Sequence, residues 1–244
     1  MKKKYTFEEL VKIVEELRSE HGCPWDKEQT HQSLRPCMME EAAELLAAIR
    51  IYEQTNNADN MQEELGDILL QAVMHSVIAG EEGLFTIEDV ISGISEKMIR
   101  RHPHVFGDKA AENAGQALES WEEIKRQEKK EQTWVTSALR EIPAELPSLT
   151  RAVKVAKKLD KLPEYHRTNG ASVIEDYDTL MGQLQEQAKA FAALGKQASK
   201  QEKNEQMTKM LQILCHISYR EGLQPEQLLY DEIEKQIDFY EKSV

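Results

Sequence analysis

The chain has 244 residues, of which 31% are charged and 40% are hydrophobic, so it is long enough for one large domain or two small ones. Its net charge of −13 argues against a general nucleic-acid binder and against a membrane-surface protein, because both need an excess of basic residues. Aromatic residues, glycine and proline are all sparse, which disfavours a sandwich or barrel with many turns.

The three cysteines, Cys23, Cys37 and Cys215, form no CxxC pair and no even framework. No signal-like apolar stretch follows the first residues, so we expect reduced thiols in a cytoplasmic protein. No apolar run approaches the length that is needed to span a bilayer.

Helical signals run along the whole chain. Thr6 with Glu9 predicts a capped helix over about 7–20, and Thr86 with Asp89 caps another that ends near Arg101. Apolar residues at helical period predict further helices over about 36–52, 59–79, 116–131, 149–159, 173–194, 202–220 and 225–242. No segment alternates convincingly at period two, so the predicted fold is all-α.

Pro143 and Pro147 mark a break between two blocks of helices. We therefore expect two helical-bundle modules, with a first domain over 1–135, a linker over 136–150 and a second domain over 151–244.

Four acidic residues lie in two short phrases. Glu41 and Glu44 are spaced i,i+3, as are Glu64 and Asp67, so each pair projects from one face of its predicted helix. Two such helices side by side would gather four carboxylates, and a hard divalent cation would relieve their repulsion. The second pair borders the apolar stripe that contains Leu65 and Leu69, so partial shielding from water is expected. The alternative is a solvated acidic helix face.

The kind of metal follows from the ligand types. A di-iron carboxylate bundle needs Glu-x-x-His phrases, and neither acidic phrase is followed by a histidine at that spacing. Ligation by oxygen alone favours Mg²⁺ or Mn²⁺ over iron.

A family resemblance rests on four motifs in chain order across residues 8–130. They are the acidic EExxE…ExxD pattern (Glu40, Glu41, Glu44, then Glu64 and Asp67) and the stretches 22–30, 100–106 and 121–125. Together they resemble the MazG-type all-α nucleoside triphosphate pyrophosphohydrolases. The resemblance implies hydrolysis of an NTP or dNTP between its α and β phosphates, which yields a nucleoside monophosphate and pyrophosphate.

The resemblance also implies roles for individual residues. Glu41, Glu44, Glu64 and Asp67 would bind Mg²⁺, while Glu40 would orient a ligand or the attacking water. One departure is Asn60, where a related catalytic domain carries a lysine, so no phosphate contact is carried over to this position.

Basic and aromatic residues complete the expected substrate site. Lys97 and Arg101 share one helix face and are expected to be exposed and to hold phosphates, although solvated basic residues are the plain alternative. Lys125, one turn past Trp121, is a further phosphate candidate, and both Trp121 and Trp25 are assigned to substrate binding. Trp25 is expected in a loop, where it either stacks on a nucleobase or covers the edge of the core. His102 and His104 are interpreted as helix-end structure.

The second block resembles a MazG-like domain that has lost its metal. In the register carried on from 146–152, the acidic positions are occupied by Gln183, Glu186, Gln206 and Lys209. We therefore expect chemistry in the first domain, a structural second domain and, from the resemblance, a homodimer. A non-catalytic interaction protein is the rival hypothesis. The preferred nucleotide stays open.

Overall fold

The computed structural model describes residues 3–129, 139–161, 175–195 and 197–243. Within these ranges every regular element is a helix, which confirms the all-α prediction. The chain divides into two compact units, Met1–Lys130 and Glu131–Val244. Parts of the predicted linker and of the helices expected over 116–131 and 173–194 lie outside the described residues.

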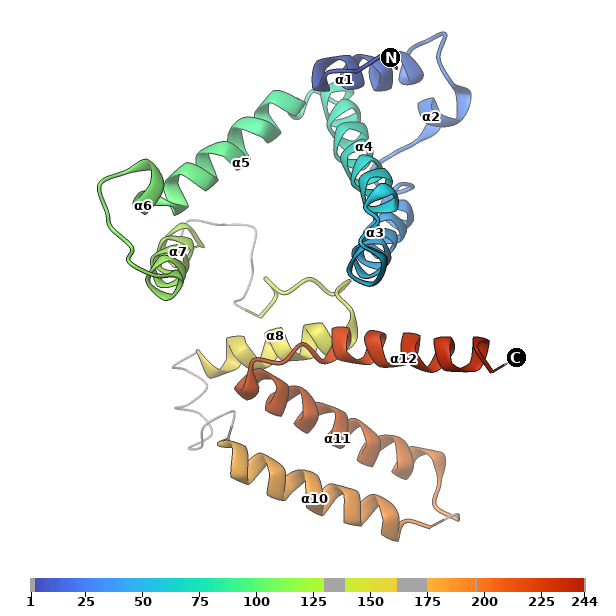
Figure 1. Cartoon of the computed structure of the whole chain (residues 1–244), viewed down its shortest axis with the longest axis vertical. Coiled ribbons are helices and arrows are strands. Elements are labelled where there is room, and N and C mark those ends of the chain that lie inside the picture. The colour runs from blue at the N-terminus through green and yellow to red at the C-terminus, as the bar shows by residue number, and fades with distance from the viewer. Residues whose placement is uncertain (1–2, 130–138, 162–174, 196, 244) are drawn as a thin grey trace. The chain divides into compact units, whose positions relative to one another are not determined.

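The first unit is built around a pair of long helices (Figure 1). Its elements are α1 (Phe7–Arg18), α2 (Pro24–Glu28), α3 (Arg35–Thr55), α4 (Asp59–Glu81), α5 (Ile87–Arg101), α6 (Pro103–Phe106) and α7 (Ala114–Lys129). Helices α3 and α4 pack along each other, and α1 packs against α4. Helix α5 leaves the end of α4 and runs away from the pair, carrying α6 and α7 with it (Figure 1).

The helix starts follow the local sequence closely. Both predicted capping boxes are present, since Thr6 pairs with Glu9 and Thr86 pairs with Asp89 through side chain and backbone. The short helices α2 and α6 were not predicted, because four or five residues are too few to show a helical period. Both begin with proline, which is favourable in the first turn of a helix.

The chain turns sharply after α1, at Gly22. A Cβ atom added there would lie 2.3 Å from the carbonyl oxygens of Glu16 and Leu17, so only glycine fits. The Cys23 amide then donates to the Leu17 oxygen at 2.7 Å. This close approach ends the first helix and directs the chain into α2.

The core of the first unit lies where α1 meets α4. Val14, Leu34, Val73, Met74 and Ile78 are buried together. Arg18 is 9% exposed and donates from Nε and Nη2 to the two oxygens of Glu81, at 2.8 and 2.7 Å. This ion pair fastens the end of α1 to the end of α4.

The apolar stripe predicted for α4 is only partly buried in a single chain. Val73 is fully buried, but Leu65 is 51% and Leu69 is 41% exposed. On α3, Ala48 is buried while Ile49 and Tyr52 are each 38% exposed. The burial expected for this stripe is therefore wrong at Leu65 and Leu69, which the first unit covers only in part. The acids beside them are nevertheless shielded as expected, because Glu64 is 8% exposed and Asp67 is partly buried.

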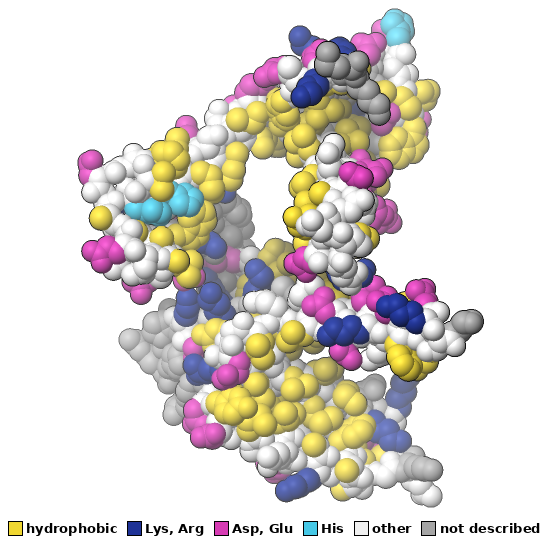
Figure 2. Space-filling model, in the orientation of Figure 1, with side chains coloured by type: hydrophobic (Ala, Val, Ile, Leu, Met, Phe, Trp, Pro, Cys, Tyr) yellow, Lys and Arg dark blue, Asp and Glu magenta, His cyan; other side chains and the backbone are white. Residues whose placement is uncertain are grey.

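The second unit contains α8 (Ser148–Asp160), α10 (Tyr177–Ala193), α11 (Lys200–Glu221) and α12 (Pro225–Glu241). Helix α11 packs against both α8 and α10, and α12 packs against α8 (Figure 1). Ala156, Leu180 and Ile217 form its buried core. Hydrophobic side chains also lie on the surface of this unit (Figure 2), most strongly on α12, where Phe239 is 68% exposed.

No helix in the described part of the chain is both long and apolar enough to cross a membrane.

Two histidines join the segment before α3 to α4. The Nδ1 atoms of His31 and His75 are 2.8 Å apart, the ring planes differ by 8° and the centroids are 5.1 Å apart. Because this centroid separation nearly equals the N–N distance plus the distance from each ring centre to Nδ1, the rings meet edge to edge through one N–H···N hydrogen bond. If both rings were charged, both Nδ1 atoms would carry a proton and two N–H groups would point at each other. The geometry therefore allows at most one of the two rings to be charged.

This pair predicts a loss of stability in mild acid. Burial, and then the nearby His31, lower the pKa of His75 below its ordinary value of 6.5. The folded state disfavours the charged form of His75, so the unfolded state takes up a proton at higher pH than the folded state does. The folded state therefore loses stability as the pH falls below the pKa of the unfolded state. We expect the Tm of the first unit to fall between pH 7.5 and 5.5.

The measurement is thermal unfolding followed by circular dichroism across this pH range. His75→Phe should weaken the dependence, whereas His21→Gln, which changes an exposed histidine, should preserve it. Equal pH profiles for the wild type and His75→Phe would contradict the assignment.

Candidate functional site

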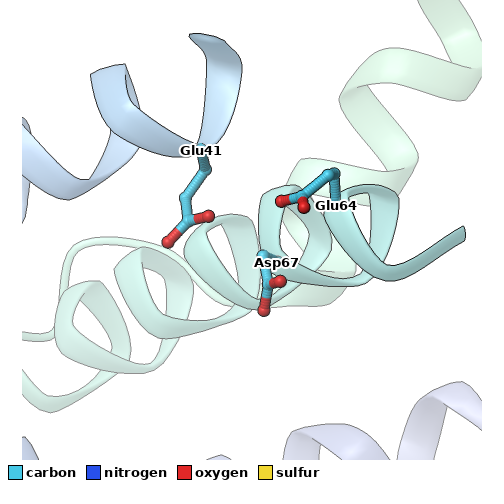
Figure 3. Close-up of side chains that lie close together, drawn as sticks. All are labelled: Glu41, Glu64 and Asp67. Atoms are coloured by element: carbon cyan, nitrogen blue, oxygen red, sulfur yellow. The ribbon is translucent and has the colours of Figure 1, made fainter. Parts of the chain in front are cut away.

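Three of the predicted acidic ligands converge between α3 and α4. Glu41 reaches from α3 toward Glu64 and Asp67, which project from neighbouring turns of α4 (Figure 3). Each residue offers one carboxylate oxygen, and these oxygens all lie within 4.8 Å of one another. Glu64 is 8% exposed, and Glu41 and Asp67 are partly buried. Such closely spaced oxygens match the ligand preference of a hard divalent cation.

The electrostatics of Glu41 reflect this crowding. Its pKa is raised, first by partial burial and then by the charges of Asp67, Glu44 and Glu64, with a smaller effect from Glu40. Each of these causes disfavours the ionised form, so the protein alone provides too little positive charge for this group of acids. A bound cation would reverse the effect.

The other two predicted acids occupy the margin of the cluster. Glu40 and Glu44 are exposed on α3, and neither belongs to the group of three oxygens within 4.8 Å. The charge of Glu44 nevertheless reaches Glu41, because it raises the pKa of that residue. Its role as a fourth ligand stays a prediction.

A line of polar residues extends the site along α4. Asn60, Glu64, Asp67, Gln71 and His75 follow one another at three- or four-residue spacing, so they share one face of the helix. The Asn60 amide donates from Nδ2 to Glu64 Oε1 at 2.7 Å. Gln71 is 7% exposed, and its Oε1 has no hydrogen-bond partner among the described residues. An uncompensated buried acceptor at this point suits a site that holds water or a ligand.

Sequence reasoning assigned no role in the site to Asn60 or Gln71. Their spacing from Glu64 and Asp67 carried the signal, because residues three or four apart on a helix are neighbours.

Arg101 differs from the prediction. It was expected to be exposed beside Lys97, but its side chain is only 12% exposed. Its guanidinium donates from Nε and Nη2 to Glu128 Oε2, at 3.0 and 2.5 Å, and lies 5.0 Å from the centre of the Trp121 ring. Glu128 also accepts from Arg100 Nε at 2.7 Å. A carboxylate from α7 therefore already holds the basic end of α5.

Hydrogen bonds from Arg101 are the main reason that the pKa of Glu128 is lowered. No spacing signal pointed to Glu128, because it lies more than 25 residues beyond its partners, on another helix.

Lys97 lies one turn before Arg101, is partly exposed and forms no ion pair with the described residues. Trp121 is packed, with the His102 ring 4.8 Å away at an interplanar angle of 60°. His102 ends α5, which agrees with its interpretation as helix-end structure. Lys125 lies exposed on α7, one turn past Trp121.

Trp25 is 60% exposed and lies on α2, not in the loop that was predicted. Since its ring is largely uncovered, the alternative that it seals the core is disfavoured.

In the second unit the positions corresponding to the acids form no such cluster among the described residues. Gln183, Glu186 and Lys209 line one hollow between α10 and α11. The Gln183 amide donates to Glu175, and Gln206 Oε1 is buried without a partner among the described residues. Of the four corresponding positions only Glu186 carries a carboxylate, so these positions provide no ligand set for a divalent cation.

The fold and the acidic cluster define an all-α protein with three carboxylates gathered between two paired helices, and these oxygen donors suit a hard metal ion. The MazG nucleotide pyrophosphohydrolase domain family matches residues 29–106. Residues 29–106 of this chain are therefore a MazG-type domain. The matched range contains all five predicted acids together with Lys97 and Arg101, and it leaves Trp25, Trp121 and Lys125 outside.

Similar proteins agree with this assignment. The chain is 49% identical over 156 residues to the nucleoside triphosphate pyrophosphohydrolase/pyrophosphatase MazG of Thermotoga maritima, which is 64% of this chain and 57% of that protein. It is 41% identical over 172 residues to the nucleoside triphosphate pyrophosphohydrolase of Escherichia coli (strain K12), covering 70% and 64% of the two chains. It is 50% identical over 153 residues to the uncharacterized protein YabN of Bacillus subtilis, covering 63% and 30%. The chain thus spans less than two thirds of the length of these relatives.

Proposed function

We propose that this protein is a metal-dependent nucleoside triphosphate pyrophosphohydrolase, which converts an NTP or dNTP into the nucleoside monophosphate and pyrophosphate. The observation that carries the proposal is the convergence of Glu41 with Glu64 and Asp67 inside the range that matches the family. The names of the Thermotoga and Escherichia relatives support the same reaction class.

The residues at the site fit Mg²⁺, with Mn²⁺ as a substitute, because all the donors are carboxylate oxygens and the pKa of Glu41 is raised by its acidic neighbours. In this proposal Glu41, Glu64 and Asp67 hold the cation, Glu44 completes the set from its exposed position, and Glu40 orients a ligand or the attacking water. When bound, the cation supplies positive charge for the triphosphate and makes a coordinated water more acidic.

Substrate binding is assigned to the basic and aromatic residues. Lys97 contacts phosphate from α5, and Arg101 does so only if the substrate competes with Glu128 for its guanidinium. Trp121 and Lys125 contribute from α7, and the exposed ring of Trp25 stacks on the nucleobase. The triphosphate and the acids repel each other, so this positive charge is needed beside the metal.

A homodimer is part of the same proposal. Leu65, Leu69 and Leu46 are between 41% and 57% exposed on the two helices that carry the acids. Val90, Ile91 and Ile94 on α5 are between 40% and 46% exposed. Exposed apolar rows on adjacent helices are typical of a surface that a partner covers, and a second copy would cover both rows. The second unit, whose described residues form no group of metal ligands, is assigned a structural role.

The test is product analysis. We expect each accepted NTP or dNTP, incubated with Mg²⁺, to give equal amounts of nucleoside monophosphate and pyrophosphate, because attack occurs at the α phosphorus. Chromatography of the nucleotides with a separate pyrophosphate assay measures both products. Nucleoside diphosphate with orthophosphate would indicate attack at the γ phosphorus and contradict the proposal. No turnover across the whole panel would favour a non-catalytic interaction protein.

A further inference from the structure

Asn60 lies in the first turn of α4, directly beside the metal-ligand candidate Glu64. Its Nδ2 donates to Glu64 Oε1 at 2.7 Å, within ordinary hydrogen-bond distance. Glu64 is the most buried member of the acidic cluster, at 8% exposure. Water therefore has little access to this carboxylate, and the Asn60 amide is the only side-chain donor to it among the described residues.

The contact has a specific effect on the geometry of the carboxylate. A glutamate side chain can rotate about its last bond, so a free carboxylate presents either oxygen or both to a cation. With Oε1 accepting from the amide, this rotation is restricted and Oε2 keeps all of its acceptor capacity for a cation. The donor is neutral, so it orients Glu64 without reducing the negative charge that Glu41, Glu64 and Asp67 provide for a cation. A lysine at position 60 would instead neutralise part of that charge.

We propose that Asn60 is a positioning residue for the metal site, which holds the Glu64 carboxylate in one orientation beside Glu41 and Asp67. The inference rests on the proposed function, because it assigns Glu64 to metal binding. Groups that orient metal ligands typically change metal affinity about 10- to 100-fold when they are removed.

A similar contact elsewhere in the chain serves as a control, because there the amide can only stabilise its helix. Gln201 on α11 donates from Nε2 to Glu205 Oε1 at 3.1 Å, also four residues apart, but both residues are exposed and neither belongs to the cluster of Glu41, Glu64 and Asp67. Replacing Gln201 removes the same kind of bond without touching the site, so it controls for loss of an i,i+4 pair.

The experiment compares the wild type with Asn60→Leu, Asn60→Gln and Gln201→Leu. For each variant the Tm is measured against increasing Mg²⁺, and separately Mn²⁺, without nucleotide, relative to its own metal-free Tm. The Mg²⁺ concentration that gives half-maximal NTP hydrolysis is measured in parallel.

For Asn60→Leu we expect both half-saturation concentrations to rise about tenfold or more, while kcat at saturating Mg²⁺ stays within about twofold of the wild type. Asn60→Gln keeps an amide donor and should recover part of the affinity, and Gln201→Leu should behave as the wild type.

Unchanged metal dependence in Asn60→Leu would overturn the inference while leaving the proposed reaction intact. A shift of equal size in Gln201→Leu would reduce the effect to helix stability and also overturn it. Metal-induced stabilisation without NTP hydrolysis in the wild type would overturn the proposed reaction, and the Tm titration would still decide the role of Asn60. If the Tm of the wild type does not change with either Mg²⁺ or Mn²⁺, both the metal site and this inference are wrong.

Discussion

Neutralising one acid of the cluster is expected to abolish most pyrophosphate release. In Glu64→Gln or Asp67→Asn the helices keep their packing, but the cation loses one charged ligand of a small set. We expect kcat/KM to fall by at least about a hundredfold, since even groups that only orient ligands change affinity by up to that amount. Glu41→Gln should act similarly, and Glu44→Gln less strongly, because Glu44 lies at the margin of the cluster.

Measuring the Tm with and without Mg²⁺ distinguishes a variant that no longer binds the metal from one that no longer folds. The pKa of Glu41 is raised, so its ionised form is disfavoured in the folded state, and this cost is present at neutral pH and disappears in acid. The metal-free Tm of Glu41→Gln should therefore equal or exceed that of the wild type, while the stabilisation by Mg²⁺ is lost.

Glu63→Gln is the matched control, because it makes the same charge change at an exposed position outside the cluster. Near-normal hydrolysis in both Glu64→Gln and Asp67→Asn, with unchanged circular dichroism, would rule out the metal site.

The second large effect concerns Arg101, whose replacement should damage the fold as well as activity. Its side chain is 12% exposed, donates twice to Glu128 and lies over Trp121, so Arg101→Ala removes a link between α5 and α7. We expect the free energy of unfolding to fall by about 1.5–3 kcal/mol, the range for hydrogen bonds that involve charged groups. Lys97→Ala should leave the Tm nearly unchanged and, if Lys97 contacts phosphate, lower kcat/KM at least about tenfold.

Arg100→Ala is the comparison for Arg101→Ala, because Arg100 is 52% exposed and also bonds to Glu128. Thermal unfolding and steady-state kinetics on all three variants give the answer. A wild-type Tm in Arg101→Ala would show that the link to α7 contributes little. Wild-type kinetics in Lys97→Ala would return that residue to the class of solvated surface lysines.

Local signals in the sequence predicted most of the helices. Capping boxes located the starts of α1 and α5 because they depend on neighbouring residues only. The i,i+3 spacing of Glu64 and Asp67 was enough to predict that they share a face, and the family resemblance supplied their pairing with α3. The short α2 and α6 escaped because each has too few residues for a period.

What the sequence could not supply were the long-range contacts. The burial of Arg101 depends on Glu128, which reaches it from another helix, and no spacing rule connects the two. The exposure of Leu65 and Leu69 could not be predicted either. A hydrophobic period indicates that a helix face is buried, but it does not show whether the same chain or another one covers that face. Asn60 was noticed only as a departure from a related domain, and its bond to Glu64 required coordinates.

Helix α4 has a consequence for how the protein fails when it is heated. One continuous helix carries Glu64 and Asp67 in its first half, and Val73 and Ile78 of the core in its second half, with Glu81 bonded to Arg18 at its end. Because the site and the core share this helix, we do not expect one of them to unfold while the other stays folded. Thermal inactivation and the melting of the first unit should coincide as a single cooperative event, and added Mg²⁺ should move both to a higher temperature together.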